Sequence, residues 1–227
     1  MPSQRRIDFK LYLITDRLGL PPGRNLVETV AAALQGGVRA VQLREKNLSP
    51  RELLPLALEL RTLSHRFGAR LLINDRIDIA QAVEADGVHL AGSSLPTAIA
   101  RRLLGPSALI GVSTHHLDEV LSAARDGADF VTFGPIYPPP SKAAYGPPVG
   151  LDALRSACAA APLPIFALGG IKSSHIPQLQ SAGAAGIALI SAILAASDPQ
   201  GAAGNLCQKL QSRQAPRLVS HPSVDYT

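Results

Sequence analysis

Short apolar segments recur along the whole chain, and stretches with helical periodicity separate them. Eight such segments span residues 11–15, 40–43, 71–73, 87–90, 109–112, 130–133, 165–168 and 186–190. The helical stretches between them include residues 25–37, 49–68, 116–128, 150–161 and 173–184. Segments that are apolar throughout indicate strands that are covered on both faces. Regular alternation of strands and helices then requires a parallel sheet.

Eight strand–helix units predict an α/β protein with a single (β/α)8 TIM barrel, formed by residues 1–213. Ser49 before Pro50 is a typical helix start. A last helix is expected near residues 198–213, and residues 214–227 are expected to form a flexible C-terminal tail. A doubly wound open sheet is the alternative, but the count of eight and the lack of a GxGxxG motif after the first segment disfavour it.

Composition argues against several classes of protein. No apolar run approaches the length needed to span a bilayer, and the basic N-terminus lacks a signal-peptide core, so a cytoplasmic location with no membrane contact is expected. The net charge is +5, but no run of five Lys and Arg residues exists and aromatic residues make up only 4%, so nucleic acid is not an expected partner. Cys158 and Cys207 lack metal-ligand spacing and are expected to be free thiols.

Polar residues follow nearly every predicted strand. In a barrel, the residues after the carboxyl ends of the strands surround one common site. These residues are Arg44 and Lys46; Asn74, Asp75 and Arg76; Gly92, Ser93 and Ser94; Ser113, Thr114, His115 and His116; Lys142; Gly169 and Gly170; and Ser191.

Cations outnumber acids among these residues, which favours an anionic ligand. Arg44, Lys46 and Lys142 would converge only in a barrel, and together they suit a phosphate or a pyrophosphate. Backbone N–H groups at Gly169–Gly170 and at the helix start near Ser191 would suit a second phosphate. We therefore expect two anionic subsites.

Taken singly, each feature has another interpretation. Arg44 and Lys46 could be a surface pair, and Asn74–Asp75 could be a capped turn. His115 and His116 are adjacent, so at most one of them points inward. Lys142 could simply be solvated.

Several strings of residues resemble the thiamine phosphate synthase family, which also contains the thiazole tautomerases. They are "LYLITDR", "VQLREKN", "LLINDRIDIAQAVEADGVHL", "IGVSTHHLDEVLSAARDGADFVTFGPIYP" and "ALGGI" followed by "GAAGIALISAI". The resemblance runs from about Leu11 to about Leu194. It implies a barrel enzyme of thiamine biosynthesis that condenses hydroxymethylpyrimidine diphosphate with thiazole phosphate, or its carboxylate, and releases pyrophosphate. Assembly into a homo-oligomer is a further expectation from the resemblance. The family uses Mg²⁺ to hold the diphosphate.

The resemblance also implies roles for individual residues. It places Gln42, Arg44 and Lys46 in the "QxREK" string, with the cations on the diphosphate, and it makes Asp75 a magnesium ligand beside Asn74. Ser113 would lie near the pyrimidine. The remaining implied substrate contacts are Ser141 and Lys142 in the loop after the sixth strand, and Gly170, Ile190 and Ser191 around the thiazole phosphate.

Two departures from the family pattern affect the diphosphate half of the site. Ser94 stands where the family has a second magnesium-binding Asp, and a neutral hydroxyl is a poor substitute for a carboxylate. Pro139 replaces a Thr in the loop after the sixth strand. A thiazole tautomerase, with His115 as acid or base, would tolerate both changes and is the alternative function. A non-catalytic barrel that binds thiazole phosphate is a second alternative.

Overall fold

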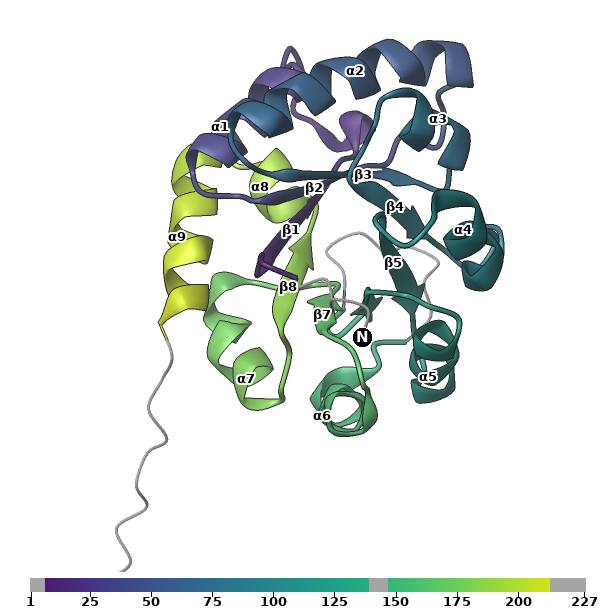
Figure 1. The fold of residues 1–227 in the computed structure, drawn as a ribbon. Coiled ribbons are helices and arrows are strands. Elements are labelled where there is room, and N and C mark those ends of the chain that lie inside the picture. Colours follow the sequence, from purple (N-terminus) through teal and green to yellow (C-terminus); the bar gives the residue numbers. More distant parts are fainter. Residues whose placement is uncertain (1–6, 139–146, 213–227) are drawn as a thin grey trace, which may run out of the picture.

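The strands of the chain close into a barrel. The structure is a computed structural model that describes residues 7–138 and 147–212. All strands are parallel and pair in chain order, and β8 closes the ring against β1 (Figure 1). The strands are β1 (Leu11–Ile14), β2 (Ala40–Leu43), β3 (Arg70–Asn74), β4 (Gly87–Leu90), β5 (Leu109–Thr114), β6 (Phe130–Phe133), β7 (Ile165–Leu168) and β8 (Gly186–Leu189). The predicted (β/α)8 barrel is therefore confirmed.

Helices surround the ring of strands in Figure 1. They are α1 (Leu26–Gln35), α2 (Pro50–Arg66), α3 (Ile77–Ala82), α4 (Thr97–Leu104), α5 (Leu117–Arg125), α6 (Gly150–Ala160), α7 (Ile176–Ser181), α8 (Ser191–Leu194) and α9 (Pro199–Gln211). The predicted start of α2 is confirmed, because the Ser49 hydroxyl accepts from the Glu52 N–H and the Glu52 carboxylate accepts from the Ser49 N–H. The last helix is α9, and residues 214–227 lie outside the described residues.

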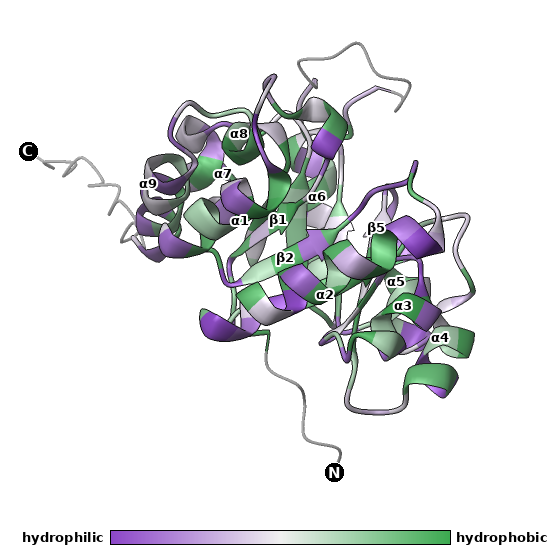
Figure 2. Ribbon diagram, turned by 90° about the horizontal axis from the view of Figure 1, so that it is seen from above, coloured by the Kyte–Doolittle hydropathy of each residue, from purple (hydrophilic) through white to green (hydrophobic). Residues whose placement is uncertain are grey.

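The apolar core has two layers on either side of the strands. The outer layer lies between strands and helices and includes Val41, Leu71 and Val131. The inner layer fills the barrel and includes Tyr12, Leu72 and Phe130. Figure 2 shows hydrophobic strands at the centre and helices that carry both hydrophobic and hydrophilic residues. Strands buried on both faces explain why their sequences do not alternate.

An aromatic cluster closes the amino end of the barrel. Phe9, just before β1, is 4% exposed. Its ring centroid lies 5.2 Å from that of Phe166, 5.6 Å from that of Phe130 and 5.8 Å from that of Tyr12. Edge and tilted contacts of this kind favour tight packing. The barrel is therefore filled from below, and its polar residues lie towards the carboxyl end.

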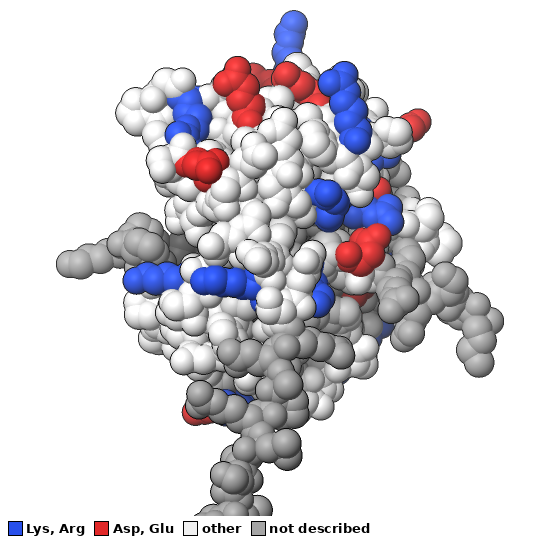
Figure 3. All heavy atoms as spheres, turned by 90° about the vertical axis from the view of Figure 1, so that its left-hand side faces the viewer, with Lys and Arg blue, Asp and Glu red and all other residues white. Residues whose placement is uncertain are grey.

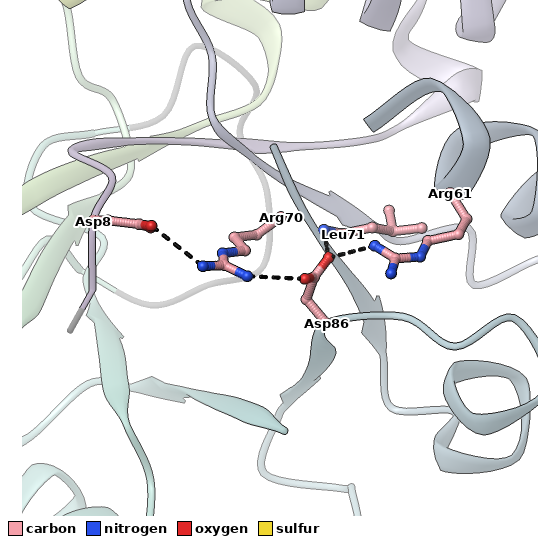
Figure 4. Close-up of polar contacts among 5 residues, drawn as sticks. All are labelled: Asp8, Arg61, Arg70, Leu71 and Asp86. Atoms are coloured by element: carbon pink, nitrogen blue, oxygen red, sulfur yellow. Dashed lines mark hydrogen bonds and ion pairs between the residues drawn. The ribbon is translucent and has the colours of Figure 1, made fainter. Parts of the chain in front are cut away.

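A charged network ties strands and helices together at the amino end (Figure 4). The Asp86 carboxylate accepts from the Leu71 N–H at 2.9 Å and from the Arg61 guanidinium at 2.9 Å. Arg70 donates to Asp86 at 3.2 Å and to Asp8 at 3.3 Å. In barrels, such interactions at the amino end serve stability rather than chemistry.

The structure shows how the charged side chains and the two cysteines of the chain are distributed. On the face that carries α1 and α9, side chains of both signs are interspersed among uncharged residues (Figure 3). Within the described ranges, no helix has the length and apolar character to cross a membrane. Cys158 and Cys207 are free, as predicted. Both are half-buried, and burial raises the pKa of Cys158 to about 11.

Candidate active site

The predicted cations at the end of β2 lie at the carboxyl mouth of the barrel. The Arg44 side chain is half-buried and that of Lys46 is exposed. The Arg44 backbone N–H donates to the Thr15 hydroxyl at 2.9 Å, which joins the ends of β2 and β1. The positive charge of Arg44 also contributes to lowering the pKa of His89, which is buried inside the barrel.

Glu45, between the two cations, has a structural role that the sequence reading missed. It is 6% exposed, and its carboxylate accepts from the Thr15 hydroxyl at 2.7 Å and from the Arg17 N–H at 3.1 Å. Burial is the main reason that the pKa of Glu45 is raised. The sequence held one signal for this role: neighbouring residues of an extended segment point to opposite sides, so Glu45 is expected to point away from Arg44 and Lys46. Glu45 therefore holds the loop after β1 in place beside the cations.

Asn74 and Asp75 form a tight turn at the end of β3. Asp75 adopts a φ of +64°, a left-handed conformation that Asp tolerates better than most residues. Its N–H donates to the His89 carbonyl at 2.9 Å, and the Arg76 N–H donates to the Asn74 carbonyl at 2.7 Å. The Asp75 side chain is exposed at the mouth. Arg76 instead pairs with Asp78, so it is not a free cation of the site.

Ser94 closes the turn after β4 with its own side chain. Its hydroxyl accepts from the Ala91 N–H at 2.8 Å, and its N–H donates to the Ala91 carbonyl at 2.9 Å. The hydroxyl is thus committed to the loop as an acceptor. This contact makes Ser94 a weaker candidate for a metal ligand than a carboxylate would be.

The donor set fits a magnesium ion only if other ligands come from substrate and water. In the part of the chain that the structure describes, no group of three or more His, Cys, Asp or Glu side chains could hold a metal. Asp75 is the exposed carboxylate at the predicted position. Mg²⁺ keeps several waters and is commonly bound through one or two carboxylates plus substrate phosphates. One carboxylate at the mouth is compatible with that arrangement.

Gln42 and Ser113 belong to a polar cluster inside the barrel. The Gln42 amide donates to the Tyr12 hydroxyl at 3.1 Å, and Ser113 Oγ lies 3.0 Å from His89 Nε2. Burial, and to a smaller extent Arg44, lowers the pKa of His89 to about 3. The imidazole is therefore neutral at physiological pH. Tyr12 and His89 were not singled out from the sequence, although a His within the apolar segment "GVHL" was a usable signal.

His115 lies at the end of β5 with its ring against the neighbouring loop. Its Nδ1 is 2.5 Å from the Gly134 carbonyl oxygen, and its N–H donates to the Glu119 carboxylate at 2.6 Å. His116 is exposed at the start of α5. The structure thus brings His115, and not His116, into contact with the residues that follow β6.

The predicted second phosphate subsite lies where β7 and β8 end side by side. Leu168 pairs with Ala188, so Gly169 and Gly170 are next to Ile190 and Ser191. Gly170 has a φ of +62°, and a Cβ there would lie 2.6 Å from the Pro138 carbonyl oxygen. The Tyr137 N–H donates to the Gly169 carbonyl at 3.1 Å. Gly170 thus lets the loop after β6 pack directly on this turn.

Three predicted features fall outside the described residues. They are Ser141, Lys142 and the departure at Pro139. Two surface hollows, one beside Lys10 and Gln180 and one beside Arg61 and Glu84, lie at the amino end of the barrel and contain no predicted site residue.

Comparison with known proteins identifies the family of this site. The model of the family described as thiamine monophosphate synthase matches residues 11–193. The chain belongs to the thiamine monophosphate synthase family. The match spans all strands of the barrel, so the candidate site lies within the shared region.

Individual members of the family are similar over nearly the whole chain. A protein of Geobacter sulfurreducens named putative thiamine-phosphate synthase is 57% identical over 208 residues, which are 92% of this chain and 97% of that one. The thiamine-phosphate synthase of Chloroflexus aurantiacus is 46% identical and covers 88% of this chain and 92% of its own. The solved structure of a thiamine phosphate pyrophosphorylase from Pyrococcus furiosus matches with a TM-score of 0.80 at 36% identity, over 89% of this chain and 95% of that one.

Proposed function

We propose that the chain is a thiamine-phosphate synthase, a transferase that joins hydroxymethylpyrimidine diphosphate to thiazole phosphate and releases pyrophosphate. The observation that carries the proposal is the shared name of relatives that are 57% and 46% identical over most of the chain. The residues at the mouth support it, because cations and a carboxylate stand at the ends of neighbouring strands β2 and β3.

Arg44 and Lys46 act on the leaving group in this proposal. The C–O bond between the pyrimidine methylene carbon and the diphosphate breaks, and both bonding electrons leave with the diphosphate oxygen. Cations close to that oxygen stabilise the charge as it develops. The lone pair of the thiazole nitrogen then forms the new C–N bond to the methylene carbon. The reaction needs no nucleophilic side chain of the protein.

Asp75 would hold Mg²⁺ together with diphosphate oxygens and water. The ion would supply further positive charge against the leaving diphosphate. Asn74 shares the turn with Asp75 and would orient the same ligand. Lys142 is proposed to add a third cation from the loop after β6, by resemblance to the family.

Gly170, Ile190 and Ser191 would hold the phosphate of the thiazole at the ends of β7 and β8. Fixing this phosphate would position the thiazole relative to the pyrimidine, which lowers the entropic cost of bringing the two substrates together. We also propose a cytoplasmic location, since both substrates are phosphorylated metabolites. Assembly into a homo-oligomer stays a prediction from the family resemblance.

The decisive experiment incubates purified protein with hydroxymethylpyrimidine diphosphate, thiazole phosphate and Mg²⁺. The expected result is thiamine phosphate and pyrophosphate in equal amounts, with product formation lost in Asp75→Ala. No product from the wild type would refute the proposal. Isomerisation of thiazole phosphate carboxylate without Mg²⁺, abolished by His115→Ala, would then identify a tautomerase. Tight binding without any product would identify a non-catalytic binder.

A further inference from the structure

Four side chains from four strands form a chain of hydrogen bonds inside the barrel, which we call the file. Gln42 Nε2 is 3.1 Å from the Tyr12 hydroxyl, which lies 3.3 Å from His89 Nδ1. His89 Nε2 is 3.0 Å from Ser113 Oγ. Gln42, Tyr12 and His89 are each no more than 2% exposed. The residues come from β2, β1, β4 and β5 in that order.

The donor and acceptor atoms of these groups determine the direction of each hydrogen bond in the file. The Gln42 amide nitrogen can only donate, so the Tyr12 oxygen accepts from it. A buried hydroxyl hydrogen needs an acceptor of its own. His89 Nδ1 is the other atom in contact with the Tyr12 oxygen among the described residues, so Tyr12 donates to Nδ1. Nδ1 therefore carries no hydrogen.

The position of the hydrogen on His89 determines the direction of its hydrogen bond with Ser113. An imidazole whose Nδ1 accepts a hydrogen bond is neutral and holds one hydrogen. With Nδ1 acting as acceptor, that hydrogen is on Nε2 and is donated to Ser113 Oγ. The ring cannot move aside easily, because Gly111 next to it is so close that a Cβ would lie 2.5 Å from Nδ1.

Ser113 then has its own hydroxyl hydrogen left to donate. Thr132, the register partner of Ser113 on β6, is 1% exposed and could have taken that hydrogen. Its Oγ1 has no hydrogen-bond partner among the described residues, so the hydrogen is not used there. Ser113 is half-buried one residue before the end of β5, at the mouth.

We propose that Tyr12 and His89 are positioning residues that fix the Ser113 hydroxyl as a hydrogen-bond donor to a lone pair of the bound substrate. The role of Ser113 on substrate rests on the proposed function, whereas the orientation of the file does not. Tyr12 and His89 act through Ser113 and need not touch substrate themselves.

A double-mutant cycle tests the action through Ser113. Tyr12→Phe removes the donor to Nδ1 and keeps the ring, and we expect kcat/KM to fall roughly threefold to tenfold, the worth of about one hydrogen bond. In the Ser113→Ala background the same change is expected to have no effect on kcat/KM. Equal losses in both backgrounds would overturn the proposal, because a merely structural role of Tyr12 is indifferent to Ser113.

A matched control separates the loss of this hydroxyl from the loss of a hydroxyl elsewhere. Thr62→Val removes an exposed hydroxyl of α2 that donates to the Leu58 carbonyl at 3.0 Å. This variant is expected to retain the kcat/KM of the wild type. A loss as large as that of Tyr12→Phe would count against the proposal.

Nitrogen NMR tests the orientation without any turnover. In ¹⁵N-labelled wild-type protein, the His89 signals, assigned by their absence in His89→Gln, are expected to show hydrogen on Nε2 and none on Nδ1. Hydrogen on Nδ1 would overturn the proposal. If the wild type makes no thiamine phosphate, the proposed function fails while this measurement still decides the direction of the file. It also needs no folded Tyr12→Phe variant.

Discussion

Glu45 accepts a hydrogen bond from the hydroxyl of Thr15, and the two oxygens are 2.7 Å apart. The same hydroxyl accepts from the Arg44 N–H at 2.9 Å. Thr15 thus links the end of β1 to both the acid and the cation that follow β2. The acid of the "REK" string thus holds the loop after β1, and the two cations beside it are the proposed substrate contacts.

Replacing Glu45 should cost stability. Glu45→Ala leaves the Thr15 hydroxyl and the Arg17 N–H without their acceptor. We expect the free energy of unfolding to fall by about 1–3 kcal/mol, as for buried donors that lose a partner. Urea denaturation followed by circular dichroism measures this. An unchanged unfolding midpoint would contradict the structural role of Glu45.

The raised pKa of Glu45 predicts the sign of a pH effect. The folded carboxyl binds its proton more tightly than the unfolded one, whose pKa is near 4.5, so protonation favours the folded state. This contribution is fully present below about pH 4.5 and is lost as pH rises through the raised pKa. The stability of Glu45→Gln relative to the wild type should therefore increase across that interval in urea titrations.

Glu52 provides the opposite case in the same measurement. Its hydrogen bonds with Ser49 hold the pKa of Glu52 below its ordinary value. Its contribution should be present at neutral pH and lost as pH falls. A Glu52→Gln curve with the same slope as that of Glu45→Gln would refute the assignment.

Gly170→Ala should disturb the turn that supports the proposed thiazole phosphate subsite. A Cβ would lie 2.6 Å from the Pro138 carbonyl oxygen and 2.7 Å from that of Tyr137. We expect the KM for thiazole phosphate to rise at least about tenfold, which corresponds to the loss of about 1.4 kcal/mol of binding. Steady-state kinetics at saturating diphosphate substrate checks this.

Gly68→Ala is the matched control for Gly170→Ala. Gly68 has nearly the same conformation, with φ of +59°, but nothing lies within 4 Å of the added Cβ. Both variants carry the backbone strain of about 1–2 kcal/mol. Only Gly170→Ala adds the clash, so equal kinetics in the two variants would contradict the prediction.

Asp86→Ala should affect stability without affecting chemistry. The change removes the acceptor of the Leu71 N–H and of Arg61, and one of the two acceptors of Arg70, at the amino end of the barrel (Figure 4). We expect a loss of about 1–3 kcal/mol in the free energy of unfolding, with kcat/KM at low temperature unchanged. Asp152→Ala, which breaks an exposed pair with Arg155, should cost at most about 0.5 kcal/mol.

Ser94→Asp should strengthen the response to Mg²⁺. In the proposed site, a carboxylate at this position would add a charged oxygen ligand to that of Asp75, and affinity for hard cations rises with ligand charge. We expect the half-saturating Mg²⁺ concentration in the synthase assay to fall roughly tenfold, a change of about 1.4 kcal/mol. Ser93→Asp adds the same charge at the exposed neighbouring position and should change it little. Equal responses in both variants would indicate a general charge effect.

The sequence predicted the barrel because strands buried on both faces are apolar at every position. A chain that repeats such strands with helices between them can form only a few folds. It also placed Arg44, Asp75 and Gly170 correctly at strand ends, since parallel strands all end at one mouth. It did not predict the partners of Glu45, because Thr15 and Arg17 belong to another loop. The file from Gln42 to Ser113 was missed for the same reason, since its contacts join strands that are far apart in the chain.

Phe9 and the rings packed around it give the barrel a single opening. Both substrates and both products would pass through the same mouth. In the proposed reaction, the substrate that contacts Ser113 would have to bind before the other substrate covers it. Pyrophosphate, held at the rim by Arg44 and Lys46, would leave first. Thiamine phosphate keeps the ring at Ser113, so its release would govern how soon the next cycle begins.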